Sequence, residues 1–387
     1  MKKLKNTFAL LITSILTICA ASSLLLVSCS NDDSPTPVPI PALIPGSYQN
    51  YSMVTSGYYH SLAIKTDGTI WSWGNNGAGQ LGYPTTTSSG AKSPRKIGTS
   101  TWTTIATGGS FNLAIKTDGT LWGWGVNDFG NLNDATLVNK TVPYMMGTAT
   151  NWKAIAAGLS HTLAVKTDGT LWACGLNHLY QLGDGTTTTR TSLRQIGTAT
   201  NWKEIAAGNT FSIGIKTDGT LWRWGTLQGV ISTVPSQIGT ATNWKSISAG
   251  DSQALAIKTD NTLWVWGNNA NGQLGDGTMV AKADPVQLGT ATWKTASSGK
   301  KTTLAIKSDG TLWSWGNNDR GQLGNGSNTD ELTPRQVGTS TNWNTVYTSL
   351  QHSLGTKTDN TLFGWGNNAN SQLGDGTTTS IKSPKRI

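Results

Sequence analysis

The sequence predicts an all-β protein, a seven-bladed β-propeller of four-stranded antiparallel blades preceded by a signal peptide and a proline-rich linker. Three observations predict this fold. One phrase recurs seven times, each copy holds four short strand-like segments, and the 18 tryptophans return at the same places in the copies. Four short strands in a repeat of about 40–50 residues are typical of a propeller blade. The phrase is close to Lys-Thr-Asp-Gly-Thr-Leu-Trp-x-Trp-Gly, and its turn aspartates are Asp67, Asp118, Asp168, Asp218, Asp260, Asp309 and Asp359.

The third repeat shows the predicted blade most clearly. Residues 152–158 form an apolar segment that ends in glycine, and residues 161–166 alternate apolar side chains, as a half-buried strand does. Asp168-Gly169 then predicts a hairpin turn, because glycine adopts positive φ without strain. A third strand, a long loop and a short fourth strand complete the repeat. The predicted units are 51–97, 102–147, 152–196, 202–238, 244–288, 293–337 and 343–387.

The tryptophans occupy three positions of the repeat, and we interpret them as the core between blades. A large aromatic side chain buries 150–250 Å² of surface, which suits this role better than a ligand-binding aromatic box. The fourth unit departs from the pattern between Gly225 and Pro235, where the usual Gly-Gln-Leu-Gly loop is missing. We therefore expect a notch in the rim at blade four.

The N-terminus has the pattern of a secretory signal. Lys2, Lys3 and Lys5 precede an apolar stretch from residue 8 to residue 27, and Cys29 follows it. The segment ending at Cys29 resembles the lipobox of bacterial lipoproteins, which implies that this cysteine is acylated. The acidic residues after it resemble the surface-export signal of Bacteroidota lipoproteins. A plain transmembrane anchor is the alternative.

The expected domains are a signal peptide at 1–28, an acylated cysteine with a linker at 29–48, and the propeller at 49–387. Five prolines between residues 34 and 46 favour an extended, semi-rigid spacer. Cys19 lies in the signal and Cys29 is assigned to the lipid, so Cys174 remains alone in the propeller and no disulfide is expected there.

The repeated phrases resemble the regulator-of-chromosome-condensation repeat. They are Trp-Gly-x-Asn-x-x-Gly-Gln-Leu-Gly, at residues 73–82, 266–275 and 315–324, and Ala-Ala-Gly-x-x-His. The resemblance extends from about residue 51 to residue 387 and implies a seven-bladed propeller. Secreted bacterial members are similar to a β-lactamase-inhibitory propeller protein, which implies binding of a protein through one face.

Strand direction assigns the variable loops to a single face. The Gly-x-x-x turns and the long loops meet at one end of the blades, and variable loops on a rigid scaffold are where binding usually occurs. Phe111 and Phe211 stand at the histidine position of the repeat, so a partly buried role is the alternative for them. The apolar half of the predicted binding face comprises Tyr58, Tyr59, Phe111, Phe129, Leu159, His178, Leu179, Tyr180 and Phe211. The polar half comprises Lys300, Lys301 and Arg320, with Asp251, Gln253 and Gln351.

His60, His161 and His352 share one position of the repeat, but they belong to dispersed blades. We therefore expect a structural hydrogen bond within the blade, and neither a metal site nor a cofactor. The sequence holds no P-loop, zinc-protease or nucleophile-elbow motif, so an enzyme is not expected. The formal charge of +9 falls to +6 without the three lysines of residues 1–28, and much of the remainder comes from the lysine of the repeated phrase, which is spread around the repeat and disfavours nucleic acid.

Together these features predict a non-enzymatic, monomeric binding module. We expect it to be lipid-anchored through Cys29 in the cell envelope, at the outer membrane and exposed on the surface. Its partner is an unknown protein, because aromatic anchors are enriched at protein interfaces. Carbohydrate or cell-wall binding by the same aromatic face is the alternative.

Overall fold

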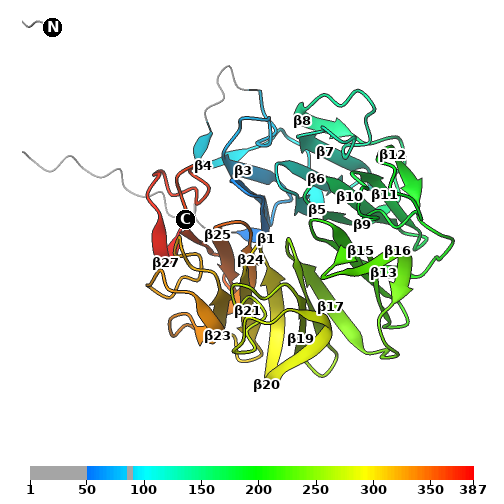
Figure 1. Cartoon of the computed structure of the whole chain (residues 1–387). Coiled ribbons are helices and arrows are strands. Elements are labelled where there is room, and N and C mark those ends of the chain that lie inside the picture. The colour runs from blue at the N-terminus through cyan, green and yellow to red at the C-terminus, as the bar shows by residue number, and fades with distance from the viewer. Residues whose placement is uncertain (1–49, 85–89) are drawn as a thin grey trace, which may run out of the picture. The chain divides into compact units, whose positions relative to one another are not determined.

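The structure is a computed structural model that describes residues 50–84 and 90–387. These residues form 27 β-strands arranged as blades around a central axis (Figure 1). No helix among them is long and apolar enough to cross a membrane. The predicted signal peptide, Cys29 and the proline-rich linker lie outside the described residues.

Each blade is a sheet whose strands pair in chain order. In blade one, β1 (Tyr51–Ser56) pairs with β2 (His60–Lys65), which pairs with β3 (Ile70–Gly74), which pairs with the outer strand β4 (Ala91–Lys96). The next blades are β5 (Trp102–Thr107), β6 (Phe111–Lys116), β7 (Leu121–Gly125) and β8 (Lys140–Met145), then β9 (Trp152–Ala157), β10 (His161–Lys166), β11 (Leu171–Gly175) and β12 (Arg190–Gln195), then β13 (Trp202–Ala207), β14 (Phe211–Lys216), β15 (Leu221–Leu227) and β16 (Val230–Gln237). The remaining strands are β17 (Trp244–Ala249), β18 (Gln253–Lys258), β19 (Thr262–Gly267), β20 (Lys282–Ser298), β21 (Thr302–Lys307), β22 (Leu312–Gly316), β23 (Glu331–Gln336), β24 (Trp343–Thr348), β25 (His352–Lys357), β26 (Leu362–Gly366) and β27 (Ile381–Arg386).

Strand β20 is long because it serves two blades. Its first part pairs with β19 as the outer strand of blade five, and its last part pairs with β21 as the inner strand of blade six. The described residues therefore form five four-stranded sheets and one seven-stranded sheet, which together make seven blades. The predicted all-β propeller is confirmed.

The tryptophans at two repeat positions form the core between blades, as predicted. Trp124 is fully buried, and its Nε1 donates to the carbonyl of Gln80 in the preceding blade, at 3.1 Å. Trp102 packs against it at the base of the same blade. The third position, represented by Trp122, is only half-buried. There the ring lies under the ammonium of Lys116, 3.6 Å from its centroid, so this lysine and its counterparts pack on aromatic rings.

The ring closes where blade seven meets blade one. Trp73 donates to the Gln372 carbonyl at 2.9 Å, and Ser61 Oγ is hydrogen-bonded to His352 Nε2 at 3.0 Å. Leu354 and Ile387 share an apolar cluster with Trp73. Side-chain packing thus joins the first and last blades.

The histidines of the repeat link neighbouring blades. His60 Nε2 is 2.7 Å from Asn112 Oδ1 in the next blade, and His161 Nε2 is 2.9 Å from Ser212 Oγ. These Nε2 bonds run between blades because the imidazole extends past its own sheet into the interface. The expected bond within a blade occurs at His352, whose Nδ1 is 3.2 Å from Ser349 Oγ.

Blade four ends in a tight hairpin where other blades carry the long loop. Gln228 and Gly229, with φ of 49° and 76°, form the turn between β15 and β16. Leu227 fills the space that a loop leucine fills elsewhere, since it belongs to the cluster around Trp266. Among the described residues, Trp266 Nε1 finds no hydrogen-bond acceptor.

Candidate functional site

The candidate site lies on one face of the propeller, which we call the loop face. The turn between β1 and β2 and the loop between β3 and β4 end on it, together with their counterparts in the other blades. The Asp-Gly turns and the links between blades lie at the opposite end. This antiparallel order places all the sequence-predicted binding residues in segments that end at, or lead away from, the loop face.

The inner strands of the blades surround a central channel of about 420 Å³. Its wall is rich in hydroxyl groups, and it includes the half-buried Glu204, whose carboxylate accepts a hydrogen bond from the Ile247 amide at 3.0 Å. Burial raises the pKa of Glu204. The channel narrows toward the loop face, where the inner turns approach so closely that a Cβ on Gly108 would lie 2.4 Å from the Gly158 carbonyl.

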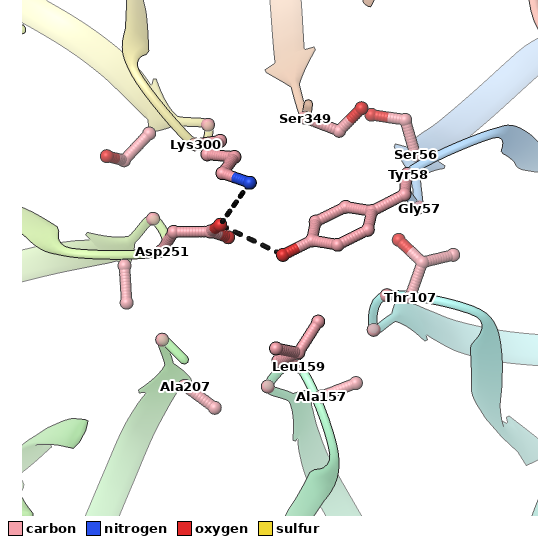
Figure 2. Close-up of a pocket in the computed structure, with 18 of the residues that line it drawn as sticks. Ser56, Gly57, Tyr58, Thr107, Ala157, Leu159, Ala207, Asp251, Lys300 and Ser349 are labelled. Atoms are coloured by element: carbon pink, nitrogen blue, oxygen red, sulfur yellow. Dashed lines mark hydrogen bonds and ion pairs between the residues drawn. The ribbon is translucent and has the colours of Figure 1, made fainter. Parts of the chain in front are cut away.

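Four side chains close the mouth of this channel, and Figure 2 shows them pointing toward one another. Tyr58, from the turn of blade one, extends across the axis and donates to Asp251 Oδ2 of blade five at 2.9 Å. Lys300 Nζ of blade six lies 3.9 Å from the same oxygen and 5.7 Å from the centre of the Tyr58 ring. Leu159 lines the same opening. We call Tyr58, Leu159, Asp251 and Lys300 the mouth cluster.

The mouth cluster holds a carboxylate and a phenol away from solvent. Burial raises the pKa of Asp251, while the Tyr58 hydrogen bond and the Lys300 charge oppose that rise. Burial also raises the pKa of Tyr58, and the neighbouring Asp251 charge adds to the effect. Tyr58 therefore remains a neutral donor and Asp251 its acceptor, an arrangement that binds blades one, five and six together.

A polar depression of about 480 Å³ extends from the mouth cluster over blades four and five. Asn209, Ser252, Asn268, Asn271 and Lys301 line it, beside the mouth cluster. Sequence reasoning named Lys301 but missed the three asparagines. Asn268 and Asn271 stand at variable positions of the loop phrase and Asn209 occupies a variable turn, so the same reasoning could have found all three.

Exposed aromatic side chains lie on the loop face outside the mouth cluster, although the Tyr59 ring contacts the edge of the Tyr58 ring, with 6.3 Å between centroids. Tyr59 and Phe129 expose 38% and 37% of their surface, and His178 is also exposed. Leu179 and Tyr180 are half-buried in the loop of blade three. On the polar side, Lys301 and Arg320 are exposed. The structure thus divides the predicted residues: Tyr58, Leu159 and Lys300 close the channel, whereas the exposed side chains named here face outward.

The prediction that Phe111 and Phe211 belong to the binding face is wrong. Phe111 and Phe211 are each 1% exposed and belong to the apolar clusters between blades. They take the place of the histidine of other blades, and a buried ring there cannot contact a partner. The polar Gln253 is buried as well, and its Nε2 donates to the Gly299 carbonyl at 2.8 Å.

No group of three or more metal-ligating side chains occurs among the described residues. Burial lowers the pKa of His60 to about 4 and that of His161 and His352 to about 3, so these imidazoles are neutral near neutral pH. Burial raises the pKa of Cys174 to about 12, which keeps its thiol protonated and unreactive.

Comparison with solved structures shows the same fold. The chain is similar to yeast RCC1 (Prp20), solved bound to Kap60, with a TM-score of 0.73 and 20% identity over 82% of this chain and 83% of that one. Human WBSCR16 gives the same TM-score and identity over 82% of this chain and 93% of that one. A further structure of Prp20p from Saccharomyces cerevisiae, which was described together with its binding to Gsp1p and histones, also has a TM-score of 0.73, at 19% identity over 88% of this chain and 87% of that one.

Sequence relatives match shorter stretches. The chain is 34% identical to the Arabidopsis thaliana Ultraviolet-B receptor UVR8 over 117 residues, which are 30% of this chain and 26% of that protein. It is 38% identical to the human probable E3 ubiquitin-protein ligase HERC6 over 93 residues, or 23% of this chain and 9% of that protein. The matched part is therefore well under two thirds of each relative.

The repeat itself matches a known family. Residues 118–165, 168–215, 260–306, 309–355 and 359–387, together more than half of the chain, match the Regulator of chromosome condensation (RCC1) repeat. A second form of the same repeat matches residues 54–80, 102–131, 152–181, 244–273 and 293–322. Most of the longer matches run from the hairpin turn of one blade to the second strand of the next, and the shorter matches lie within single blades. The protein belongs to the RCC1 repeat family.

Proposed function

We propose that this protein is a non-enzymatic binding module that recognises a protein partner through the loop face. In this proposal the chain is held at the cell envelope by lipid on Cys29, after removal of residues 1–28, with residues 29–48 as a spacer. The propeller is then exposed at the surface of the outer membrane, and it acts as a monomer. The related propeller of yeast RCC1 (Prp20) was solved bound to the protein Kap60, which supports a role in protein binding.

One observation carries the proposal: large aromatic side chains are exposed on the face where the otherwise repeated scaffold varies. Tyr59 and Phe129 lie in segments of blades one and two whose residues differ between copies. Exposed aromatic rings next to a polar depression match the composition of protein interfaces, where aromatic anchors supply most of the binding energy. The mouth cluster gives these residues a rigid centre.

The test is affinity capture from the organism's own secreted and surface proteins, using residues 46–387, which contain every described strand and core residue. A variant with Tyr59→Ala, Phe129→Ala and His178→Ala should lose at least about tenfold in affinity for a specifically captured protein, since truncated interface anchors cost above about 2 kcal/mol. A matched control carries Val142→Ala and Val286→Ala, which remove exposed apolar side chains from the outer strands β8 and β20, away from the loop face.

Equal capture by the loop-face variant and the wild-type chain contradicts the proposal. Loss in the control variant as well also contradicts it, because the binding surface is then elsewhere. A glycan array tests the alternative function, carbohydrate binding. Binding of a glycan that is lost in Tyr59→Ala would show that the aromatic face stacks on sugar rings. Mass spectrometry of the membrane-extracted protein tests the lipid on Cys29 independently.

A further inference from the structure

Two neighbouring outer strands carry an unusual concentration of positive charge. Strand β4 of blade one reads Ala-Lys-Ser-Pro-Arg-Lys, and strand β27 of blade seven reads Ile-Lys-Ser-Pro-Lys-Arg. The two strands flank the junction where the ring closes. All six basic side chains are exposed. We call them the seam patch: Lys92, Arg95, Lys96, Lys382, Lys385 and Arg386.

The seam patch is one continuous surface. The loop of blade seven lies against β4, because the Gly376 amide donates to the Lys92 carbonyl at 2.9 Å. A Cβ on Gly376 would lie 3.9 Å from Ser93 Oγ. The same loop contacts β27 through Asp375, which pairs with Lys385 at 2.9 Å. Blades one and seven are thus packed at the rim as well as at the core.

Two lysines of the seam patch, Lys92 and Lys382, have no carboxylate partner among the described residues. Elsewhere a basic residue of the outer strand pairs with an acid of its own blade, as Arg190 does with Asp184 at 2.7 Å and Arg335 with Glu331 at 2.8 Å. At the seam, Asp375 pairs with Lys385, and Asp67 interacts with Lys96.

We propose that the seam patch docks on the phosphate groups of an anionic lipid membrane. Clusters of four to eight basic residues are attracted to anionic lipid surfaces, with about 1 kcal/mol from each residue. The outer strands form the convex rim of the ring, which suits a flat charged surface better than a single small anion. The inference deepens the anchoring part of the proposed function and rests on it for the presence of a membrane.

The position of the patch sets the orientation of the propeller. Strand β1, which follows the segment leading from Cys29, belongs to the same blade as β4. Figure 1 shows β4 and β27 on the side of the ring opposite β15 and β16. Docked by the seam, the propeller stands on its rim, with blades three and four farthest from the lipid. The loop face then stands perpendicular to the membrane, and Leu179 and Tyr180 lie on the part of that face that is far from the lipid.

The experiment measures binding of residues 46–387, which carry no lipid, to phosphatidylcholine vesicles with and without phosphatidylglycerol. Binding should require phosphatidylglycerol and weaken with added salt, which screens surface charge. The variant Lys92→Gln with Lys382→Gln should bind roughly 25-fold more weakly, at about fivefold for each charge removed. The control Lys153→Gln with Lys203→Gln removes the same charge from exposed lysines of blades three and four and should bind like the wild-type chain.

Three outcomes overturn the proposal: equal binding to both vesicle types, equal weakening in the control pair, and tighter binding to single-stranded DNA than to phosphatidylglycerol vesicles. The circular dichroism spectrum and thermal midpoint of each variant verify its fold. The vesicle assay needs neither acylated Cys29 nor a protein partner. Its result can therefore be interpreted even if the tests of the proposed function find no lipid on Cys29 and no protein partner.

Discussion

The hydroxyl of Tyr58 and the carboxylate of Asp251 meet at 2.9 Å across the axis of the ring, although 193 residues separate them in the chain. Their blades are the first and the fifth, so this hydrogen bond joins blades that are not neighbours. Five of the inner turns also donate a backbone hydrogen bond to the turn beside them, as the Tyr58 amide does to the Gly109 carbonyl at 3.0 Å. The mouth cluster adds a tie across the ring to this circumferential series.

Removing the Tyr58 hydroxyl should destabilise the propeller. Tyr58→Phe leaves the largely buried carboxylate of Asp251 without its donor, and we expect the free energy of unfolding to fall by about 1–3 kcal/mol. Urea unfolding followed by tryptophan fluorescence measures the change. Tyr59→Phe is the matched control, since this exposed tyrosine should change stability by less than about 0.5 kcal/mol. Equal stability of the two variants would show that the tie contributes nothing.

Stability should fall in mild acid because the interface histidines are buried and neutral. Their lowered pKa values mean that the unfolded chain binds more protons than the folded chain between pH 6.5 and about 4. The contribution of these histidines to the free energy of unfolding should therefore be fully present above pH 6.5. It should then decrease with falling pH by up to about 1.4 kcal/mol per pH unit for each histidine.

Urea midpoints over this pH range check the expectation, with His161→Phe as the comparison. Phenylalanine already occupies the same position at Phe111 and Phe211, so the substitution fits the blade. The variant should show a shallower dependence on pH, whatever its stability at neutral pH. Parallel curves for the variant and the wild-type chain would contradict the assignment to the histidines.

In blade five, serine at position 254 should lower stability, although most blades carry a polar residue at this position. Ser61 and Ser353 donate at 2.8 Å to a loop carbonyl of the preceding blade, and Ala254 holds the equivalent place in blade five. Because blade four ends in the Gln228-Gly229 turn, it presents no such loop carbonyl within the described residues. Ala254→Ser should thus bury an unpaired hydroxyl and lower stability by about 1–3 kcal/mol.

The comparison for this variant is Ser353→Ala, which removes the bond to the Gln322 carbonyl and should also destabilise. The two substitutions are opposite in chemistry, yet both should lower the thermal midpoint. Ala254→Ser would instead stabilise the protein if agreement with the repeat were all that mattered, and that result would refute the role given to blade four.

The lysines of the repeated phrase should stabilise the blades through their aromatic contacts. Lys307 Nζ lies 3.5 Å from the centroid of Trp313 and 5.6 Å from that of Trp293. Lys307→Met keeps an apolar stem but removes the charge, and should cost about 0.5–1 kcal/mol in chemical denaturation. Lys153→Met, at an exposed lysine, is the control. An equal cost in both variants would show that Lys307 contributes no more to stability than an exposed surface lysine.

The binding face was predictable only in outline. The order of strands and turns placed Tyr59, Phe129 and His178 on the loop face, and the structure exposes all three. The same reasoning treated Phe111 and Phe211 as surface residues, because a side chain at the first residue of a strand can point either outward or into the neighbouring blade. That direction depends on the packing between sheets, which no local pattern encodes.

The sequence by itself determined the repeat, the number of blades and the short hairpin at blade four, since turn chemistry and the spacing of tryptophans are local properties of the chain. Only the tertiary structure decided that Tyr58 crosses the axis to Asp251 and that Lys92 and Lys382 share one rim. Both relationships join the first blade to a distant part of the chain. They exist because a closed ring brings such blades together, and a period along the chain carries no information about contacts made across that ring.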